Sequence, residues 1–253
     1  MLKKIALTGI FAASATFASW DLFPVLPKNQ GEAHTGLAYN ETNYASCLTM
    51  FAGARFSVIQ NLELGVMVPF RFYTELHGTE MDDVNGLGNI EASIRYQFIP
   101  KMNAFFDVAI PVGDDSYNVE DEWTLKGGFQ FSSILTPTVN FGSELGVQYE
   151  TEGEKNYSEL AANISAELDF TVVPHYTPYI RSTVSFIIGI YDDSGFDSFL
   201  GKNTPVGTWI TVGSKFDITE WLNLDASYGV GIGDHLYGPN RPKTYGLGLN
   251  FRF

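Results

Sequence analysis

The chain has 253 residues, 45% of them hydrophobic and 15% aromatic, with a formal net charge of -14 at pH 7. Its acidic residues gather in short clusters between apolar stretches, which argues against nucleic acid or an anionic membrane surface as a partner. The single cysteine excludes an internal disulfide framework, so a core or a closed sheet must supply the stability.

The first 18 residues have the pattern of a secretory signal peptide. Two lysines precede an apolar run over residues 5–17, and small residues at 16 and 18 fit the positions that a signal peptidase inspects. The run is too short to span a membrane as a helix. A buried N-terminal helix is the alternative, but the segment 20–24 breaks a helical continuation. We therefore expect a signal peptide over 1–18 and one exported domain over 19–253.

Apolar and polar residues alternate from about residue 31 to the end of the chain. Successive side chains of a strand point to opposite faces, so this period of two predicts strands with one apolar face and one polar face. Each segment is long enough to cross a bilayer at a tilt, which takes about 9–11 residues. We predict about twelve strands, near 33–41, 45–58, 62–74, 87–99, 103–113, 123–135, 139–150, 157–172, 176–190, 205–218, 222–233 and 244–253.

The connections between these segments alternate between two kinds. Five are tight turns, at 59–61, 100–102, 136–138, 173–175 and 219–221. Five others are longer and polar, at 77–86, 114–122, 151–156, 191–204 and 234–243. Outer-membrane barrels have short periplasmic turns and longer extracellular loops, whereas a secreted β-sandwich predicts no such rhythm. We predict an all-β fold, a closed antiparallel up-and-down transmembrane β-barrel.

Prolines interrupt two of the predicted strands. Pro69 lies in the third and Pro111 in the fifth. Because proline removes a hydrogen bond from the ladder, each is predicted to mark a bulge or the outer rim.

The last predicted strand shows its two faces most clearly. One face carries Tyr245, Leu247, Leu249, Phe251 and Phe253, and the residues between them are glycine, asparagine and arginine. An apolar face with aromatic rings at both ends suits a strand between lipid and a polar lumen. The strand resembles the terminal strand of bacterial outer-membrane barrels, whose final phenylalanine is part of the signal for the barrel-assembly machinery.

Three segments resemble a known family in their order and spacing. Residues 61–70 read NLELGVMVPF, residues 85–90 read NGLGNI and residues 108–114 read VAIPVGD. They resemble the outer-membrane family associated with the meta-pathway of phenol degradation, most closely over residues 50–150. The family pattern has an aspartate where this chain has Asn89, and a threonine where it has Val112. The resemblance implies a transporter-like barrel with aromatic or other small hydrophobic compounds as cargo.

Alternation also assigns charged residues to the lumen. The inward set near the periplasmic end comprises the bases Arg55, Arg95, Arg181, Lys215 and Arg252 and the acids Glu63, Asp107, Glu167, Asp169, Asp217 and Asp225. The outer half of the same face carries Gly65, Gly86 or Gly88, Gly128, Gly189, Gly207 and Gly233, with Arg71 and Glu144 as isolated charges. Because unpaired charges in a confined lumen are costly, the balanced set is predicted to form salt bridges below a glycine-lined vestibule. It would act as a selectivity filter or as a structural plug.

The sequence has no enzyme signature. It contains no G-x-S-x-G elbow, no zinc-spaced histidines or cysteines and no phosphate loop, so we expect no enzyme, no cofactor and no metal site. We predict a bacterial outer-membrane barrel that passes small solutes, with a non-conducting structural or adhesive barrel as the alternative. The expected partners are outer-membrane lipid and lipopolysaccharide, the barrel-assembly machinery and a small-molecule solute.

Overall fold

The fold was analysed in a computed structural model, which describes residues 25–112, 122–153, 156–201, 204–233 and 241–253. The predicted signal peptide lies outside these residues. Among the described residues, twelve long strands form the wall. They are β1 (Gly31–Glu41), β2 (Ala45–Ile59), β3 (Leu62–Leu76), β6 (Ile90–Ile99), β7 (Met102–Ile110), β8 (Thr124–Thr136), β9 (Val139–Glu150), β10 (Ser158–Phe170), β11 (Tyr176–Asp192), β13 (Val206–Asp217), β14 (Leu222–Ile232) and β15 (Lys243–Arg252).

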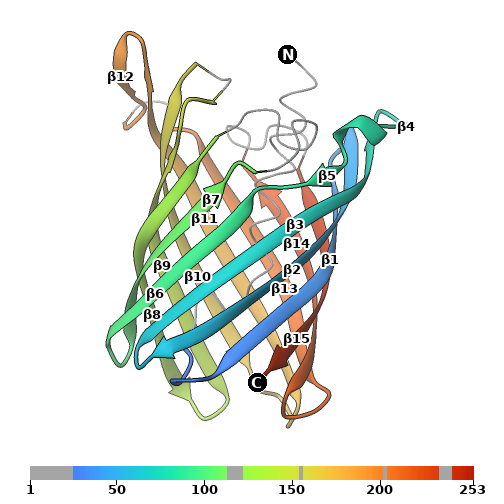
Figure 1. The fold of residues 1–253 in the computed structure, drawn as a ribbon, viewed down its shortest axis with the longest axis vertical. Helices are drawn as coiled ribbons and strands as arrows, with labels where there is room; N and C mark the ends of the chain where they lie inside the picture. The colour runs from blue at the N-terminus through green and yellow to red at the C-terminus, as the bar shows by residue number, and fades with distance from the viewer. Residues whose placement is uncertain (1–24, 113–121, 154–155, 202–203, 234–240) are drawn as a thin grey trace.

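The wall is a closed antiparallel barrel (Figure 1). Each long strand pairs with the strands before and after it in the sequence, as β10 does with β9 and β11. The first and last strands close the sheet, with Thr35 of β1 opposite Leu249 of β15. The predicted up-and-down barrel of about twelve strands is therefore confirmed.

The two ends of the barrel differ. Short turns and the C-terminus lie at the lower end of Figure 1. The opposite end carries β4 (Thr79–Glu80), the 3₁₀ helix η2 (Asp82–Val84), β5 (Gly86–Leu87) and β12 (Gly195–Ser198). Since outer-membrane barrels place their short turns in the periplasm, the end with β4 and β12 is the extracellular one. β12 lies within a segment that was predicted to be a loop.

The two interrupting prolines lie where ladders stop. β3 pairs with β6 only as far as Met67 opposite Glu91, and it pairs with β5 from Phe70 onward. Pro69 lies in the gap between these pairings, where its carbonyl accepts a hydrogen bond from the Gly88 amide at 2.9 Å. Pro111 follows the last residue of β7, as predicted for a strand rim.

The faces of the wall are opposite to those of a soluble protein. Leu145 is 55% exposed on the outside, whereas Glu167 is 0% exposed on the inside. The same contrast runs along the other strands, where polar side chains are buried and large apolar ones are exposed. The β-sandwich alternative, with its apolar faces packed together, is therefore excluded. No helix within the described residues is long and apolar enough to span a membrane.

Candidate functional site

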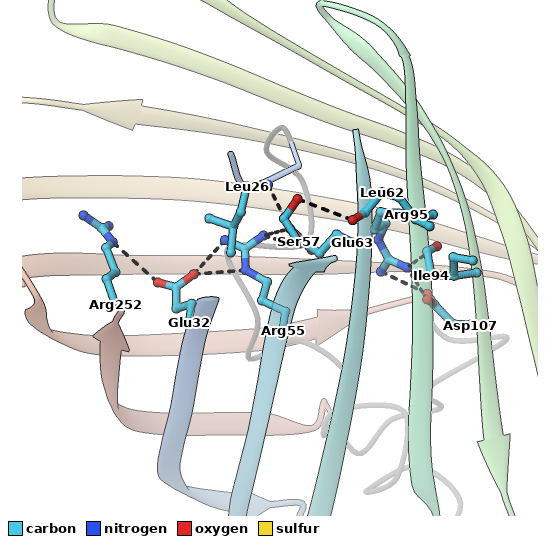
Figure 2. A network of polar contacts seen from close by, with 10 residues as sticks. All are labelled: Leu26, Glu32, Arg55, Ser57, Leu62, Glu63, Ile94, Arg95, Asp107 and Arg252. Atoms are coloured by element: carbon cyan, nitrogen blue, oxygen red, sulfur yellow. Dashed lines mark hydrogen bonds and ion pairs between the residues drawn. The ribbon is translucent and has the colours of Figure 1, made fainter. Parts of the chain in front are cut away.

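The inward faces of the wall strands bring charged side chains into three clusters. The first joins four strands that are neighbours around the barrel, β15, β1, β2 and β3 (Figure 2). Arg55 Nη2 lies 2.7 Å from Glu32 Oε2, and its Nη1 lies 3.3 Å from Glu63 Oε1. Arg252 Nε approaches the other side of the Glu32 carboxylate at 3.7 Å. One arginine therefore holds two acids from the strands on either side of it.

The chain before β1 also reaches this cluster. The Leu26 amide donates a hydrogen bond to Glu63 Oε2 at 2.9 Å, and the adjacent Val25 is buried. Figure 2 shows Leu26 beside the Arg55 cluster. Residues just upstream of the barrel thus contact the inner wall near its periplasmic end.

The second cluster lies on β6, β7, β8 and β9. Arg95 forms an ion pair with Asp107 on the neighbouring strand. Lys126 Nζ lies 2.5 Å from Glu144 Oε1, and Gln130 Nε2 donates to Glu144 Oε2 at 2.8 Å. The Phe105 ring lies between the two cations, with its centroid 5.1 Å from Arg95 Cζ and 5.3 Å from Lys126 Nζ. Cation–π attraction thus adds to both ion pairs.

The third cluster completes the circumference on β10, β11, β13 and β14. Arg181 Nε donates to Glu167 Oε2 at 2.6 Å. Lys215 Nζ lies 3.3 Å from Glu167 Oε1 and 2.9 Å from Asp169 Oδ2. The Tyr179 hydroxyl donates to Asp225 Oδ1 at 3.1 Å, and Lys215 lies over the Tyr179 ring. Charge-assisted hydrogen bonds of this kind are stronger than neutral ones.

Together the clusters form a ring of charges, which we call the lumen ring. Every one of the twelve wall strands contributes at least one charged residue, and opposite charges mostly alternate around the barrel. In circumferential order the ring comprises Arg252, Glu32, Arg55, Glu63, Arg95, Asp107, Lys126, Glu144, Glu167 with Asp169, Arg181, Lys215 and Asp225. Most of these residues lie nearer to the short turns than to the extracellular end. A ring of charges of both signs around the lumen is an arrangement that can restrict passage by size and by charge.

Sequence reasoning found most of this ring but misjudged some members. Glu144 was predicted to be isolated, yet it bonds Lys126 and Gln130. Arg71 lies on β3 and faces the barrel lumen. It is only 2% exposed and it also contacts a partner. Asp217 lies at the periplasmic end of β13, outside the ring.

Two ring members were missed. Glu32 precedes the predicted start of the first strand, although β1 begins at Gly31. Lys126 was not assigned a face, because two successive glycines follow it and blur the alternation. The alternation of Lys126, Gln130 and Ser132 with Leu125 and Phe129 is the signal that places Lys126 inside.

The predicted glycine-lined vestibule is wrong at Gly189. Gly189 was assigned to the lumen, but a bulge in the β10–β11 register shifts the alternation, and Gly189 lies opposite the outward-facing Leu160. On the lumen side, the Trp209 ring covers two glycines of β14. A Cβ added at Gly229 would lie 2.6 Å from Trp209 Nε1, and one at Gly231 would lie 2.9 Å from Cζ3. Part of the upper lumen is therefore filled by an indole.

The outer face of β15 behaves as the terminal-strand pattern predicts. Tyr245, Leu247 and Phe253 are exposed on the outside, with Leu249 and Phe251 half-buried between their neighbours. The Phe253 ring stacks on Phe56 at 6.5 Å between centroids. Its backbone exchanges two hydrogen bonds with Gly31, so the last residue is tied to the first strand.

No group of three or more histidine, cysteine, aspartate or glutamate side chains suited to a metal ion occurs among the described residues. The lumen ring is built from ion pairs.

A comparison with protein families finds a match over most of the chain. The family described as "Putative MetA-pathway of phenol degradation" matches residues 28–253. No curated protein matches the sequence.

Solved structures with the same fold are known. The outer membrane channel from Pseudomonas putida F1 is 11% identical with a TM-score of 0.69, covering 91% of this chain and 98% of that chain. The translocator domain of the autotransporter NalP from Neisseria meningitidis is 11% identical with a TM-score of 0.60, covering 99% and 98%. The NanC porin is 9% identical with a TM-score of 0.56, covering 87% and 98%. At these identities the likeness shows a shared barrel fold.

Proposed function

The chain belongs to the phenol-degradation MetA-pathway family, and we propose that this outer-membrane β-barrel passes small solutes by diffusion through its lumen. The phenol in the family description and the resemblance of the three sequence segments favour aromatic or other small hydrophobic compounds as cargo. In this role the barrel catalyses no reaction. The barrel would supply a selective path across the membrane.

The lumen ring is the observation that carries this proposal. Its six bases and seven acids leave one excess negative charge, and this excess lies on the third cluster, where Glu167, Asp169 and Asp225 face Arg181 and Lys215. The acidic loops at the extracellular end add to the negative potential along the path. Neutral and cationic solutes are therefore favoured over anions.

A second candidate function is a non-conducting structural or adhesive barrel. The burial of the ring favours it, because Glu167 is 0% exposed and its pairs with Arg181 and Lys215 span three strands. The contact between Leu26 and Glu63 also occupies space near the periplasmic end. In that case the ring would rigidify the wall and no solute would pass.

Conductance of the refolded protein in planar bilayers separates the two candidates. A channel predicts current from the wild-type barrel, with a cation preference that rises when Arg95→Gln removes a ring cation. A plug predicts a silent wild type and current only after Arg95→Gln or Arg181→Gln. Ser165→Ala, a neutral change on the inner face of β10, is the matched control and should leave either behaviour unchanged.

Proteoliposome swelling tests the kind of solute. Neutral aromatic solutes should enter faster than anionic aromatic ones of similar size. If neither the wild type nor the Arg95→Gln and Arg181→Gln variants carry current, and no swelling occurs, the channel proposal is contradicted. Equal entry of anions would contradict the assigned selectivity.

A further inference from the structure

One acid of the lumen ring lacks an ion pair. Within the described residues, the other six acids of the ring each contact a lysine or an arginine. Asp225 on β14 instead receives one hydrogen bond, from the neutral hydroxyl of Tyr179 at 3.1 Å. Lys215 lies opposite Asp225 in the β13–β14 register, but its ammonium group bonds Glu167 and Asp169. The excess negative charge of the ring is therefore centred on Asp225.

Two buried oxygen atoms on β14 and β15 accept no hydrogen bond. They are Asp225 Oδ2 and Asn250 Oδ1, and neither has a donor within the part of the chain that the structure describes. Both residues are only 7% exposed. Asn250 uses its amide group to donate to Asn223 Oδ1 at 2.6 Å, so its own carbonyl is left for another partner. A buried acceptor without a donor costs about 1–3 kcal/mol, and more if it is charged.

The register brings these two acceptors to neighbouring positions. Asn223 lies opposite Asn250, and Asp225 is the next inward residue of β14. Asp225 and Asn250 are thus diagonal neighbours, a position in which Cβ atoms lie about 7–8 Å apart or closer. Side chains of this length place their oxygens near enough to share one small donor group. The His34 ring borders the same place, because a Cβ added at Gly248, opposite Asp225, would lie 2.7 Å from His34 Nε2.

The ring is least covered on this side of the barrel. The side chain of Arg252, on the inner face of β15, is 56% exposed, and that of Lys215 is 21% exposed. The other three arginines of the ring are covered, with side chains 7–8% exposed at Arg55, Arg95 and Arg181. A solute at the periplasmic mouth therefore reaches Asp225 between two cations that are not fully packed.

We propose that Asp225 and Asn250 bind the ammonium group of an amine-bearing solute, and we call this place the amine site. The inference rests on the channel proposal and names the class of solute that the lumen selects. An ammonium group carries three N–H donors and a positive charge. It supplies the donor that each of the two oxygens lacks, and its bond to the carboxylate is charge-assisted.

The alternatives fit this place less well. Calcium takes about 6–8 oxygen ligands, whereas the described residues contain no group of three acidic or histidine side chains suited to a metal ion. An anion would be repelled by Asp225, and a neutral alcohol would leave its charge uncompensated. Two protein acceptors also make a weak site, and a solute in transit must be able to leave.

Equilibrium binding to the refolded barrel in detergent tests the amine site without requiring passage. Calorimetric titration at pH 7 compares 2-phenylethylamine with 2-phenylethanol, which is neutral, and with phenylacetate, which is an anion. The wild type should bind the amine about tenfold more tightly than either, which corresponds to about 1.4 kcal/mol. Asp225→Asn should abolish this preference, because it keeps the shape of the side chain and removes the charge.

Three further variants separate the amine site from the general charge of the mouth. Glu220→Gln removes one negative charge from an exposed position in the turn between β13 and β14, and it should leave the preference for the amine unchanged. Asp225→Glu keeps a carboxylate and should retain most of the preference. Asn250→Ala removes the second acceptor and should weaken amine binding severalfold. A heat-modifiable band shift on gel electrophoresis confirms that each variant forms a closed barrel.

Three results would overturn the proposal. The first is equal affinity of the wild type for the amine and the alcohol. The second is an equal loss of amine affinity in Asp225→Asn and Glu220→Gln, which would assign the preference to the field of the whole mouth. The third is displacement of the amine by potassium as effectively as by ethylammonium, which would assign the place to inorganic cations.

Conductance distinguishes failure of this inference from failure of the channel proposal. Current through a wild type without amine preference would remove the amine site and leave the channel standing. Amine binding that depends on Asp225, in a barrel that carries no current, would support the amine site and contradict the channel.

Discussion

The lumen face and the lipid face of β10 carry opposite kinds of residue only a few positions apart. Glu167 is 0% exposed and is held by two cations, whereas Ile164 is 48% exposed and has lipid as its expected neighbour. In a soluble protein the isoleucine would be the buried residue and the glutamate the exposed one. The difference teaches that the close-packed interior of this protein is polar, so its stability is expected to respond most strongly to changes in ion pairs.

Removal of Glu167 should produce the largest loss of stability. Glu167→Ala leaves Arg181 and Lys215 without this shared carboxylate in the lumen, and breaking such a buried pair costs about 3–5 kcal/mol. Ile164→Ala on the lipid face of the same strand should cost only about 1–2 kcal/mol, from lost apolar contact with lipid. Urea unfolding in liposomes measures both. An equal or reversed order would contradict the polar interior.

A charge on the lipid face should produce the next largest effect. Leu145 is 55% exposed, so arginine at this position would be nearly neutral in a soluble protein. Near the middle of a bilayer, Leu145→Arg should cost about 2–4 kcal/mol. Ile218→Arg is the control, since Ile218 is 51% exposed beside a periplasmic turn where arginine reaches water. Equal unfolding free energies for the two variants would show that Leu145 does not face hydrocarbon.

Crowding of the lumen face should have a smaller effect. Gly229→Ala places a Cβ 2.6 Å from Trp209 Nε1, so the indole must shift, at a cost of about 1–3 kcal/mol. Gly127→Ala is the control, because the nearest atoms to its Cβ would lie at 3.4 Å, an ordinary contact. The shift should also change Trp209 fluorescence in the first variant alone. Unchanged stability and emission would mean that Trp209 does not pack on β14.

The terminal residue should give the smallest change in stability but a clear change in assembly. Phe253→Ala loses the stack on Phe56, worth about 1 kcal/mol. If Phe253 is also part of the assembly signal, folded barrel in the outer membrane should fall severalfold while refolding in detergent remains normal. Phe253→Tyr keeps the ring and should behave as wild type. A normal cellular level of the alanine variant would rule out the assembly role.

Much of the fold could be predicted because lipid and lumen impose opposite demands on alternate residues. The period of two, the rhythm of the connections and the Phe253 terminus all point to the barrel, and the twelve wall strands match their predicted ranges within a few residues. The ring members Arg55, Arg95 and Arg181 followed from the same alternation. Here the local pattern and the global fold agree.

The details of the fold and the site that were not predicted depend on features that alternation does not encode. A bulge inserts one residue and reverses the faces beyond it, which moved Gly189 from the predicted vestibule to the outer face of the wall. The pairing partner of Glu144 depended on how far the Lys126 side chain reaches from β8. The strand β12 has four residues and lies inside a segment predicted to be a loop. Such details follow from register and side-chain length, and hydropathy does not report either.

Quenching of single-cysteine labels along β10 by lipids with doxyl-labelled chains tests the central claim most directly. Labels are placed one at a time from Asn163 to Phe170 after Cys47→Ser removes the native thiol. The account predicts strong quenching at 164, 166, 168 and 170 and weak quenching at 163, 165, 167 and 169. Quenching at the odd positions, or no period of two, would contradict the assignment of the apolar face to lipid and the charged face to the lumen.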